Sequence, residues 1–153
     1  MSLDEENRAL LVQMELEKAY RTLHVAELLM ESQEWSEAAG RTYYALFHAV
    51  SALLIKNQIR VKSHKGAYTM LCMHFVATGR VPQEFGNFYR EMELMREESD
   101  YNCFYNVNSE QIKEHYAKAK EMIDTIAEMV KEGKRDDNND NEITTRKNKI
   151  KQV

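Results

Sequence analysis

The segment SEQIKEHYAKAKEMIDTIAEMVKE, residues 109–132, decides the fold class of this chain. Its apolar residues recur at alternating spacings of four and three, at Ile112, Tyr116, Ala119, Ile123, Ile126 and Val130. This spacing places them on one face of an α-helix, because a helix turns once in about 3.6 residues. The segment therefore predicts a long amphipathic helix that ends at Gly133, a residue type typical of helix C-termini.

Four further segments show features of helices. Apolar periodicity, together with residues suited to helix starts and ends, predicts helices over 5–32, 35–57, 64–77 and 82–101. The chain has only five Gly and one Pro, too few for the many turns of an all-β protein. Because the connections are short, the sequence predicts an all-α fold: an antiparallel bundle of four long helices plus one short helix.

The predicted bundle occupies residues 1–133, which suffices for one domain with its own core. Residues 134–153 are an acidic, Asn-rich run followed by a basic run. They offer almost nothing to bury, so we expect a disordered charged tail. Ordering each of its residues would cost roughly 1–2 kcal/mol of backbone entropy, and we therefore expect the tail to be dispensable for stability.

Charge and composition exclude several classes of protein. The formal net charge of −4 disfavours non-specific binding to duplex DNA. No apolar stretch approaches the roughly 20 residues that cross a bilayer, and the first residues are acidic where a secretory signal is basic. With only Cys72 and Cys103, a disulfide framework is excluded. We expect a cytoplasmic protein that does not contact membranes.

Metal and cofactor motifs are absent from the sequence. The five histidines never form His-x-x-x-His or Glu-x-x-His, and there is no Cys-x-x-Cys, so we predict no metal site. A Gly-rich phosphate loop and a Gly-x-Ser-x-Gly elbow are also missing, which argues against P-loop hydrolysis and α/β-hydrolase chemistry. We predict no cofactor.

The first candidate site lies in the predicted helix 35–57. Arg41, Tyr44 and His48 are spaced i, i+3 and i+7, so they point in similar directions from the helix. A guanidinium, a phenol and an imidazole in a row are suited to hold an anion. The same residues allow a structural alternative, in which Arg41 pairs with a carboxylate of a neighbouring helix and His48 is a hydrogen-bonded core residue.

The second candidate site is the basic stretch RVKSHKG, residues 60–66. Ser63 is a good N-cap, so free backbone N–H groups and the positive end of the helix dipole follow it. Such a helix start binds phosphate, and Gly66 would let a ligand approach the backbone. The cationic side chains nearby are Lys62, His64 and Lys65. The alternative is a connector whose lysines only face water.

The third candidate site is REESDY, residues 96–101, at the end of the predicted helix 82–101. Arg96 and Asp100 are i, i+4 neighbours and could form only a helical ion pair, worth about 0.3–0.5 kcal/mol. In the functional interpretation Arg96 points inward, and Asp100 and Tyr101 line the same groove as Arg41.

Four motifs in a fixed order resemble the small prokaryotic HEPN-domain proteins. They are RTYYALFH at 41–48, KSHKG at 62–66, FVATG at 75–79 and REESDY at 96–101. HEPN denotes a nucleotide-binding domain of higher eukaryotes and prokaryotes, and the resemblance is to its uncharacterised-protein-family type, related to toxins paired with minimal nucleotidyltransferases. It covers residues 10–132 and implies a helical bundle, commonly dimeric.

The resemblance also implies a chemistry. Several HEPN groups are metal-independent ribonucleases with an Arg-x(4–6)-His motif, in which Arg stabilises the charge on the phosphate, His transfers a proton and the ribose 2′-OH attacks. No His follows Arg96 at that distance. Arg41 and His48 fit the count, but on an earlier helix. Binding of a nucleotide or RNA is therefore the leading hypothesis, and whether the protein is an enzyme stays open.

Three hypotheses result. In the first, a module with a nucleotidyltransferase-like partner binds nucleotide or RNA phosphate in a groove lined by Arg41, Tyr44, His48, Lys62, His64, Lys65, Arg96, Asp100 and Tyr101. In the second, a metal-independent endoribonuclease toxin uses His48 or His64 as acid–base and Arg41 or Arg96 as charge stabiliser. In the third, the bundle only dimerises and binds a partner protein.

A homodimer is expected in each case. Five helices with wide apolar stripes carry more apolar surface than one small bundle easily hides. Aromatic residues that look exposed from the sequence are Tyr89, Phe104 and Tyr105.

Overall fold

In the part of the chain that the structure describes, the fold consists of five α-helices and one π-helical turn. The computed structural model describes the backbone of residues 4–61 and 63–151 and the side chains of residues 4–61 and 63–132. The elements are α1 (Glu5–Glu31), α2 (Trp35–Lys56), α3 (His64–Leu71), the π-helical turn η1 (Cys72–Val76), α4 (Gln83–Tyr101) and α5 (Ser109–Lys151). The all-α prediction is confirmed. Within the described residues no helix is both long and apolar enough to cross a bilayer.

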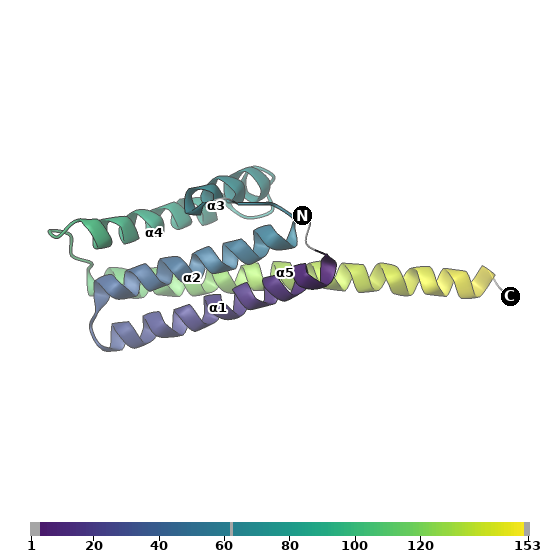
Figure 1. Cartoon of the computed structure of the whole chain (residues 1–153), viewed down its shortest axis with the longest axis horizontal. Coiled ribbons are helices and arrows are strands. Elements are labelled where there is room, and N and C mark those ends of the chain that lie inside the picture. Colours follow the sequence, from purple (N-terminus) through teal and green to yellow (C-terminus); the bar gives the residue numbers. More distant parts are fainter. Residues whose placement is uncertain (1–3, 62, 152–153) are drawn as a thin grey trace.

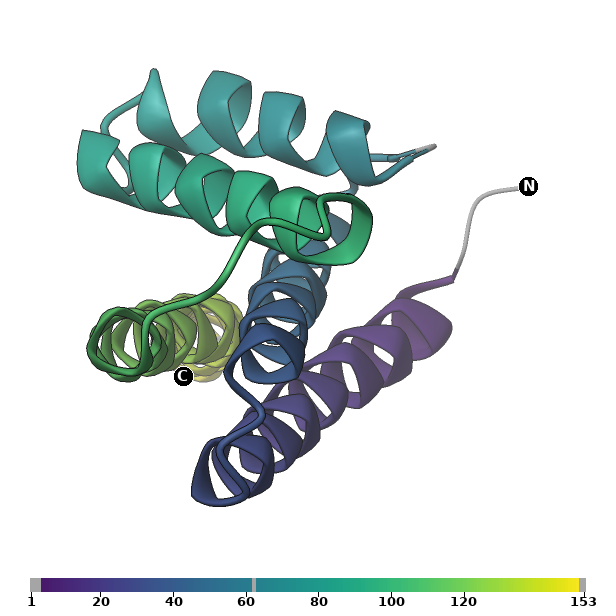
Figure 2. The same ribbon diagram turned by 90° about the vertical axis from the view of Figure 1, so that its left-hand side faces the viewer.

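Helix α2 is the centre of the bundle. Helices α1, α3, α4 and α5 all pack against it, with α1 and α5 on its flanks and the α3–η1 and α4 hairpin above them (Figures 1 and 2). Half of the 22 residues of α2 are buried, and five of these are alanines that let neighbouring helices approach closely. An apolar surface on several sides is typical of a central helix.

Short polar side chains cap the starts of α1, α3 and α5. The Asp4 carboxylate accepts from the Asn7 N–H at 2.8 Å, and the Asn108 side-chain oxygen accepts from the Glu110 N–H at the same distance. The Ser63 hydroxyl accepts from the Gly66 N–H at 3.2 Å. Each bond satisfies one backbone donor that the helix itself leaves unpaired.

The predicted helix 64–77 is divided in the structure. Its α-helical part ends at Leu71, and η1 continues it with one wider turn. Gly86 of α4 lies beside this turn, where an added Cβ would come 3.3 Å from the Cys72 sulfur. The sequence carried no signal for the change, because helix types with nearly the same apolar spacing differ only in hydrogen-bond register.

The first two helices end in the same strained turn. Gln33 and Gln58 have φ angles of 61° and 60°, in the left-handed region where Gly or Asn is usual. The Glu34 N–H bonds to the Leu29 carbonyl at 2.8 Å, and the Ile59 N–H bonds to the Leu54 carbonyl at 2.9 Å. A side chain in this conformation costs roughly 1–2 kcal/mol.

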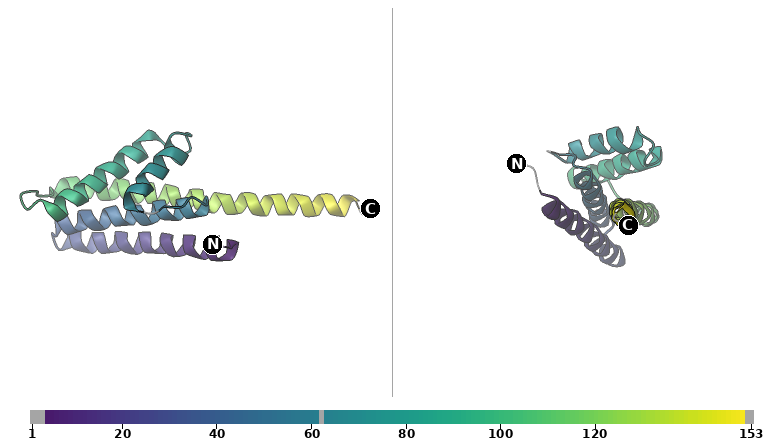
Figure 3. Two further views of the ribbon diagram at one scale, coloured as in Figure 1. Left: turned by 45° about the horizontal axis from the view of Figure 1, so that its top comes forward. Right: turned by 90° about the vertical axis from the view of Figure 1, so that its right-hand side faces the viewer.

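Helix α5 is longer than the periodicity indicated. It continues to Lys151, and its last turns extend beyond the other helices (Figures 1 and 3), so the predicted end at Gly133 was wrong. One Gly inside a helix costs only about 1 kcal/mol relative to Ala, and no Pro follows it. The division of the chain into a bundle at residues 1–133 and a disordered charged tail at 134–153 stays a prediction.

Truncation after Gly133 tests this division. Val130 is the last core residue of α5 among the side chains that the structure describes, so we expect the truncated chain to melt within about 2 °C of the full chain, a change of at most about 1 kcal/mol. Thermal unfolding followed by circular dichroism measures it. A fall of more than several degrees would mean that the tail docks on the bundle.

Candidate functional site

Arg96 of α4 points toward α2. Its guanidinium carbon lies 5.3 Å from the ring centre of Tyr43 and 5.6 Å from that of Tyr44. The side chain is only 15% exposed and pairs with Asp100 at 3.3 Å. Its Nε is buried and has no hydrogen-bond partner among the described residues. Both sequence interpretations thus hold in part: Arg96 faces inward, and it also forms the helical ion pair.

Three aromatic rings continue from Arg96 along the surface. His64, the first residue of α3, lies edge-on to Tyr44 at 5.8 Å and stacks on Phe47 at 4.1 Å between ring centres. We call Tyr44, His64 and Phe47 the aromatic row. Arg96 stands at one end of it, and His48 contacts Phe47 at the other end, 5.5 Å between centres. The row thus brings residues of all three candidate sites together.

His48 is held by a carboxylate of another helix. Its Nδ1 lies 2.8 Å from a carboxylate oxygen of Glu15 on α1, and the imidazole is half-buried. The structural alternative, a hydrogen-bonded histidine, therefore describes its position well. Glu15 was missed from the sequence, since a residue 33 positions away on another helix leaves no local signal.

The remaining predicted site residues do not all converge. Tyr44 faces α3 and α4 while His48 faces α1, so the i, i+3, i+7 row diverges. Arg41 is exposed and forms no ion pair with any described side chain. Tyr101 is 80% exposed at the end of α4. Lys62 lies outside the described residues.

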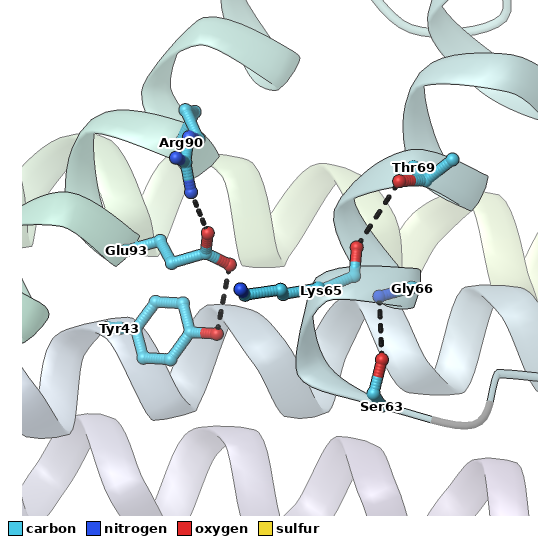
Figure 4. Close-up of polar contacts among 7 residues, drawn as sticks. All are labelled: Tyr43, Ser63, Lys65, Gly66, Thr69, Arg90 and Glu93. Carbon is cyan, nitrogen blue, oxygen red and sulfur yellow. Dashed lines mark hydrogen bonds and ion pairs between the residues drawn. The ribbon is translucent and has the colours of Figure 1, made fainter.

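The start of α3 is built differently from the expectation. Ser63 already bonds the Gly66 N–H (Figure 4), and an added Cβ on Gly66 would come 3.1 Å from a methyl carbon of Val61. The glycine thus makes room for Val61, and the approach of a ligand to its backbone stays a prediction. Lys65 is exposed, and in Figure 4 its side chain extends in the direction of Glu93 and Tyr43.

A cavity of about 700 Å³ adjoins the aromatic row. It lies between α1, the end of α2 and the connector before α3, and both Phe47 and His64 are in its lining. We call it the side cavity. Within the part of the chain that the structure describes, no three His, Cys, Asp or Glu side chains are grouped to hold a metal ion.

Comparison with known proteins identifies the family of this chain. The HEPN domain matches residues 12–130. The chain belongs to the HEPN domain family. It is similar to a UPF0332 protein of Thermotoga maritima, 34% identical over 118 residues that cover 77% of this chain and 89% of that protein. It is also 28% identical over 121 residues to "Putative toxin MJ0605" of Methanocaldococcus jannaschii, covering 79% and 90% of the two chains.

Beneath Arg96 the HEPN bundle buries a polar cluster. Glu93 of α4 is only 2% exposed; it pairs with Arg90 and accepts from the Tyr43 hydroxyl at 3.4 Å (Figure 4). Burial raises the pKa of Tyr43 to about 12. Because both partners of Glu93 are present, its charge is compensated, and the cluster links α2 to α4.

Tyr89 lies next to this cluster, and burial of its hydroxyl group destabilises the folded state. It is fully buried, so the expectation of an exposed ring was wrong: it lies on the α4 face that packs on α2, 5.8 Å from the Tyr43 ring. Burial raises the pKa of Tyr89 far above its ordinary value. The Tyr43 hydroxyl lies beside the Tyr89 hydroxyl and raises this pKa further, but no described residue forms a hydrogen bond of good geometry with the Tyr89 hydroxyl.

We predict that Tyr89→Phe stabilises the protein by about 1 kcal/mol at pH 7, because it removes an unpaired buried hydroxyl. In the native chain the folded state keeps the Tyr89 proton that the unfolded state loses above pH 10, so stability falls as the pH rises. The Tyr89→Phe variant loses less stability over the same rise in pH. Urea unfolding at pH 7 and pH 11 measures both effects, with the exposed Tyr101→Phe as control; equal behaviour of the two variants would contradict the prediction.

Proposed function

We propose that this HEPN protein binds the phosphate groups of a nucleotide or RNA along the aromatic row. One observation carries the proposal: Arg96 and His64 contact the same ring, Tyr44, from different helices. Rings that stack on bases and cations that meet phosphates are the two components of single-strand binding. The exposed Lys65 and Arg41 add positive charge around them.

We further propose that the protein acts with a nucleotidyltransferase-like partner in a toxin–antitoxin or regulatory pair. Support comes from two relatives of Methanocaldococcus jannaschii whose names begin with "Putative toxin". The second of these is 30% identical over 96 residues, which cover 63% of this chain and 65% of that protein. A cell that makes a toxin needs a partner protein that inhibits it. That this partner is nucleotidyltransferase-like follows from the family resemblance.

A metal-independent endoribonuclease is the second candidate function. The observation in its favour is the exposed imidazole of His64 on the same row as Arg96. In such a reaction the imidazole takes the proton of the ribose 2′-OH, and the guanidinium stabilises the negative charge that develops on the phosphate. His48, the other candidate acid–base, already pairs with Glu15.

Removing single surface charges tests the proposal. We expect Lys65→Ala and Arg41→Ala each to weaken binding of a short single-stranded RNA about tenfold or more, since a charge-assisted contact contributes about 1.5–3 kcal/mol. Melting temperatures should not change, because both side chains are exposed. Fluorescence anisotropy measures affinity.

The matched control is Arg21→Ala, which removes an exposed charge from α1. An equal loss in all three variants would indicate only a non-specific charge effect, and unchanged affinity in the two test variants would contradict the proposal. The same RNA is then incubated with the protein and EDTA and run on a gel. Cleavage that His64→Ala abolishes, with binding retained, would establish the ribonuclease instead.

We also predict a homodimer. Phe104 is 95% exposed beside the end of α4, where Tyr101 and Leu94 are exposed as well, whereas Tyr105 is half-buried. Covering such apolar side chains favours association. Light scattering of dilute protein should return twice the chain mass of 18.0 kDa, and Phe104→Asp should shift the population toward monomer. A native chain that stays monomeric contradicts this prediction.

A further inference from the structure

The side cavity presents an apolar surface large enough for a small molecule. Its volume of about 700 Å³ falls within the range of roughly 300–1,000 Å³ usual for ligand sites. It lies where α1 begins beside the C-terminal end of α2 (Figure 1). The apolar side chains of its lining are Phe47, Leu54, Ile55, Ile59 and Val61. All of them except Leu54 are only half-buried, so they keep apolar surface that a ligand can cover.

One wall of the cavity is a continuous stripe along α2. Its residues follow one another at helical spacing and therefore share one face of the helix; they are Phe47, Ser51, Leu54, Ile55 and Gln58. Four of the five are not fully buried. The stripe thus belongs to the part of α2 that its neighbouring helices leave uncovered.

The connector before α3 forms the opposite wall. Gln58, with a φ of 60°, reverses the chain direction, and the Ile59 N–H bonds to the Leu54 carbonyl at 2.9 Å. Val61 fits closely against Gly66, where an added Cβ would come 3.1 Å from a Val61 methyl carbon. Contacts within the protein therefore hold both walls in place, and a ligand does not have to order them.

The charged side chains of the lining already have partners in the protein. Glu15 lies 2.8 Å from His48, and Arg8 and Arg60 also interact with other groups. The His64 ring is stacked on a neighbouring ring. A charged ligand would lose hydration here without gaining a dedicated counter-ion among the described lining residues. The lining therefore favours a neutral ligand.

Neutral polar groups of the α2 stripe supply specificity. The Ser51 hydroxyl and the Gln58 amide both lie in the lining, and each can donate and accept hydrogen bonds. Gln58 is exposed, whereas Leu54 is buried. A molecule with a polar head group and an apolar chain therefore matches the cavity from its solvent side inward.

We propose that the side cavity binds a neutral amphiphile, an aliphatic chain with a hydroxyl or amide head group. The chain lies against Leu54, Ile55 and Ile59, and the head group forms a hydrogen bond with the Gln58 amide. The site does not use the phosphate contacts proposed for the aromatic row, so it is independent of the proposed function.

Titration with matched eight-carbon compounds tests the charge of the ligand. The full chain is mixed with the neutral fluorescent dye N-phenyl-1-naphthylamine at about pH 7 and titrated with 1-octanol, octanoate or octylammonium. We expect 1-octanol to displace the dye at a concentration about tenfold or more below that of either ion, a ratio that corresponds to about 1.4 kcal/mol. From 1-butanol to 1-octanol the affinity should rise about two- to fourfold per CH₂ group, since burying one contributes up to about 0.8 kcal/mol.

Filling the cavity tests the location. Ile55→Trp should weaken 1-octanol binding about tenfold or more, a loss of about 1.4 kcal/mol. Leu28→Trp adds the same side chain on the exposed surface of α1, outside the lining, and should leave the affinity unchanged. Equal binding of 1-octanol by the two variants would place the ligand elsewhere and overturn the proposal.

A gain of function decides the matter if Ile55→Trp melts early. Gln58→Glu places a carboxylate at the head-group position and should raise the affinity for octylammonium relative to 1-octanol about threefold or more, within the range of an exposed ion pair. Gln33→Glu makes the same change in the same left-handed conformation at the end of α1, outside the lining. An equal response of the two variants would contradict the assigned head-group position.

The remaining outcomes also discriminate. If octanoate binds tightest, the cavity takes an anion and the proposal is wrong. If none of the compounds displaces the dye, or if affinity does not grow with chain length, the cavity is not an amphiphile site. RNA binding by the same protein is measured separately, so either proposal can fail while the other stands.

Discussion

The close packing of α2 against every other α-helix is the constraint on which the rest of the structure depends. Its alanines bring the flanking helices close, and its larger residues Tyr43, Leu46 and Leu53 fill the spaces between them. The side chains that α2 does not fully bury are then confined to the boundaries between its neighbours. Tyr44, Phe47 and His48 emerge there, so the aromatic row follows from the way the core is packed.

Local patterns were sufficient to predict the helices. Apolar periodicity located all five within a few residues at most ends, and Ser63 was recognised as a cap because a cap needs only its own short segment. The errors arose at features that do not depend on the local sequence alone. The end of α5 depends on whether Gly133 stops a helix, and the π-helical turn after Leu71 lies against Gly86 of α4, which is distant in the sequence.

The sequence predicted which residues belong to the site, but not which of them contact one another. The sequence indicated Arg96, Tyr44 and His64, but their contacts require α2, α3 and α4 to meet, which no spacing within one helix encodes. Phe47 was not among the predicted site residues, and Glu15 lies on a distant helix. Tyr89 was misjudged for the same reason: an aromatic residue on a charged helix gives no sign of which face the bundle covers.

The polar groups of the site differ in how firmly they are held. The buried Glu93 pairs with Arg90 and Tyr43 and so fixes α4 on α2, which sets Arg96 on its two rings. The connector before α3 is short and bonded at both ends, by the Ile59 N–H at one and the Ser63 cap at the other. Groups held on such supports need little reorganisation when an anion arrives. Arg41 and Lys65 lack such support, so their contacts with phosphate should weaken with salt sooner than that of Arg96.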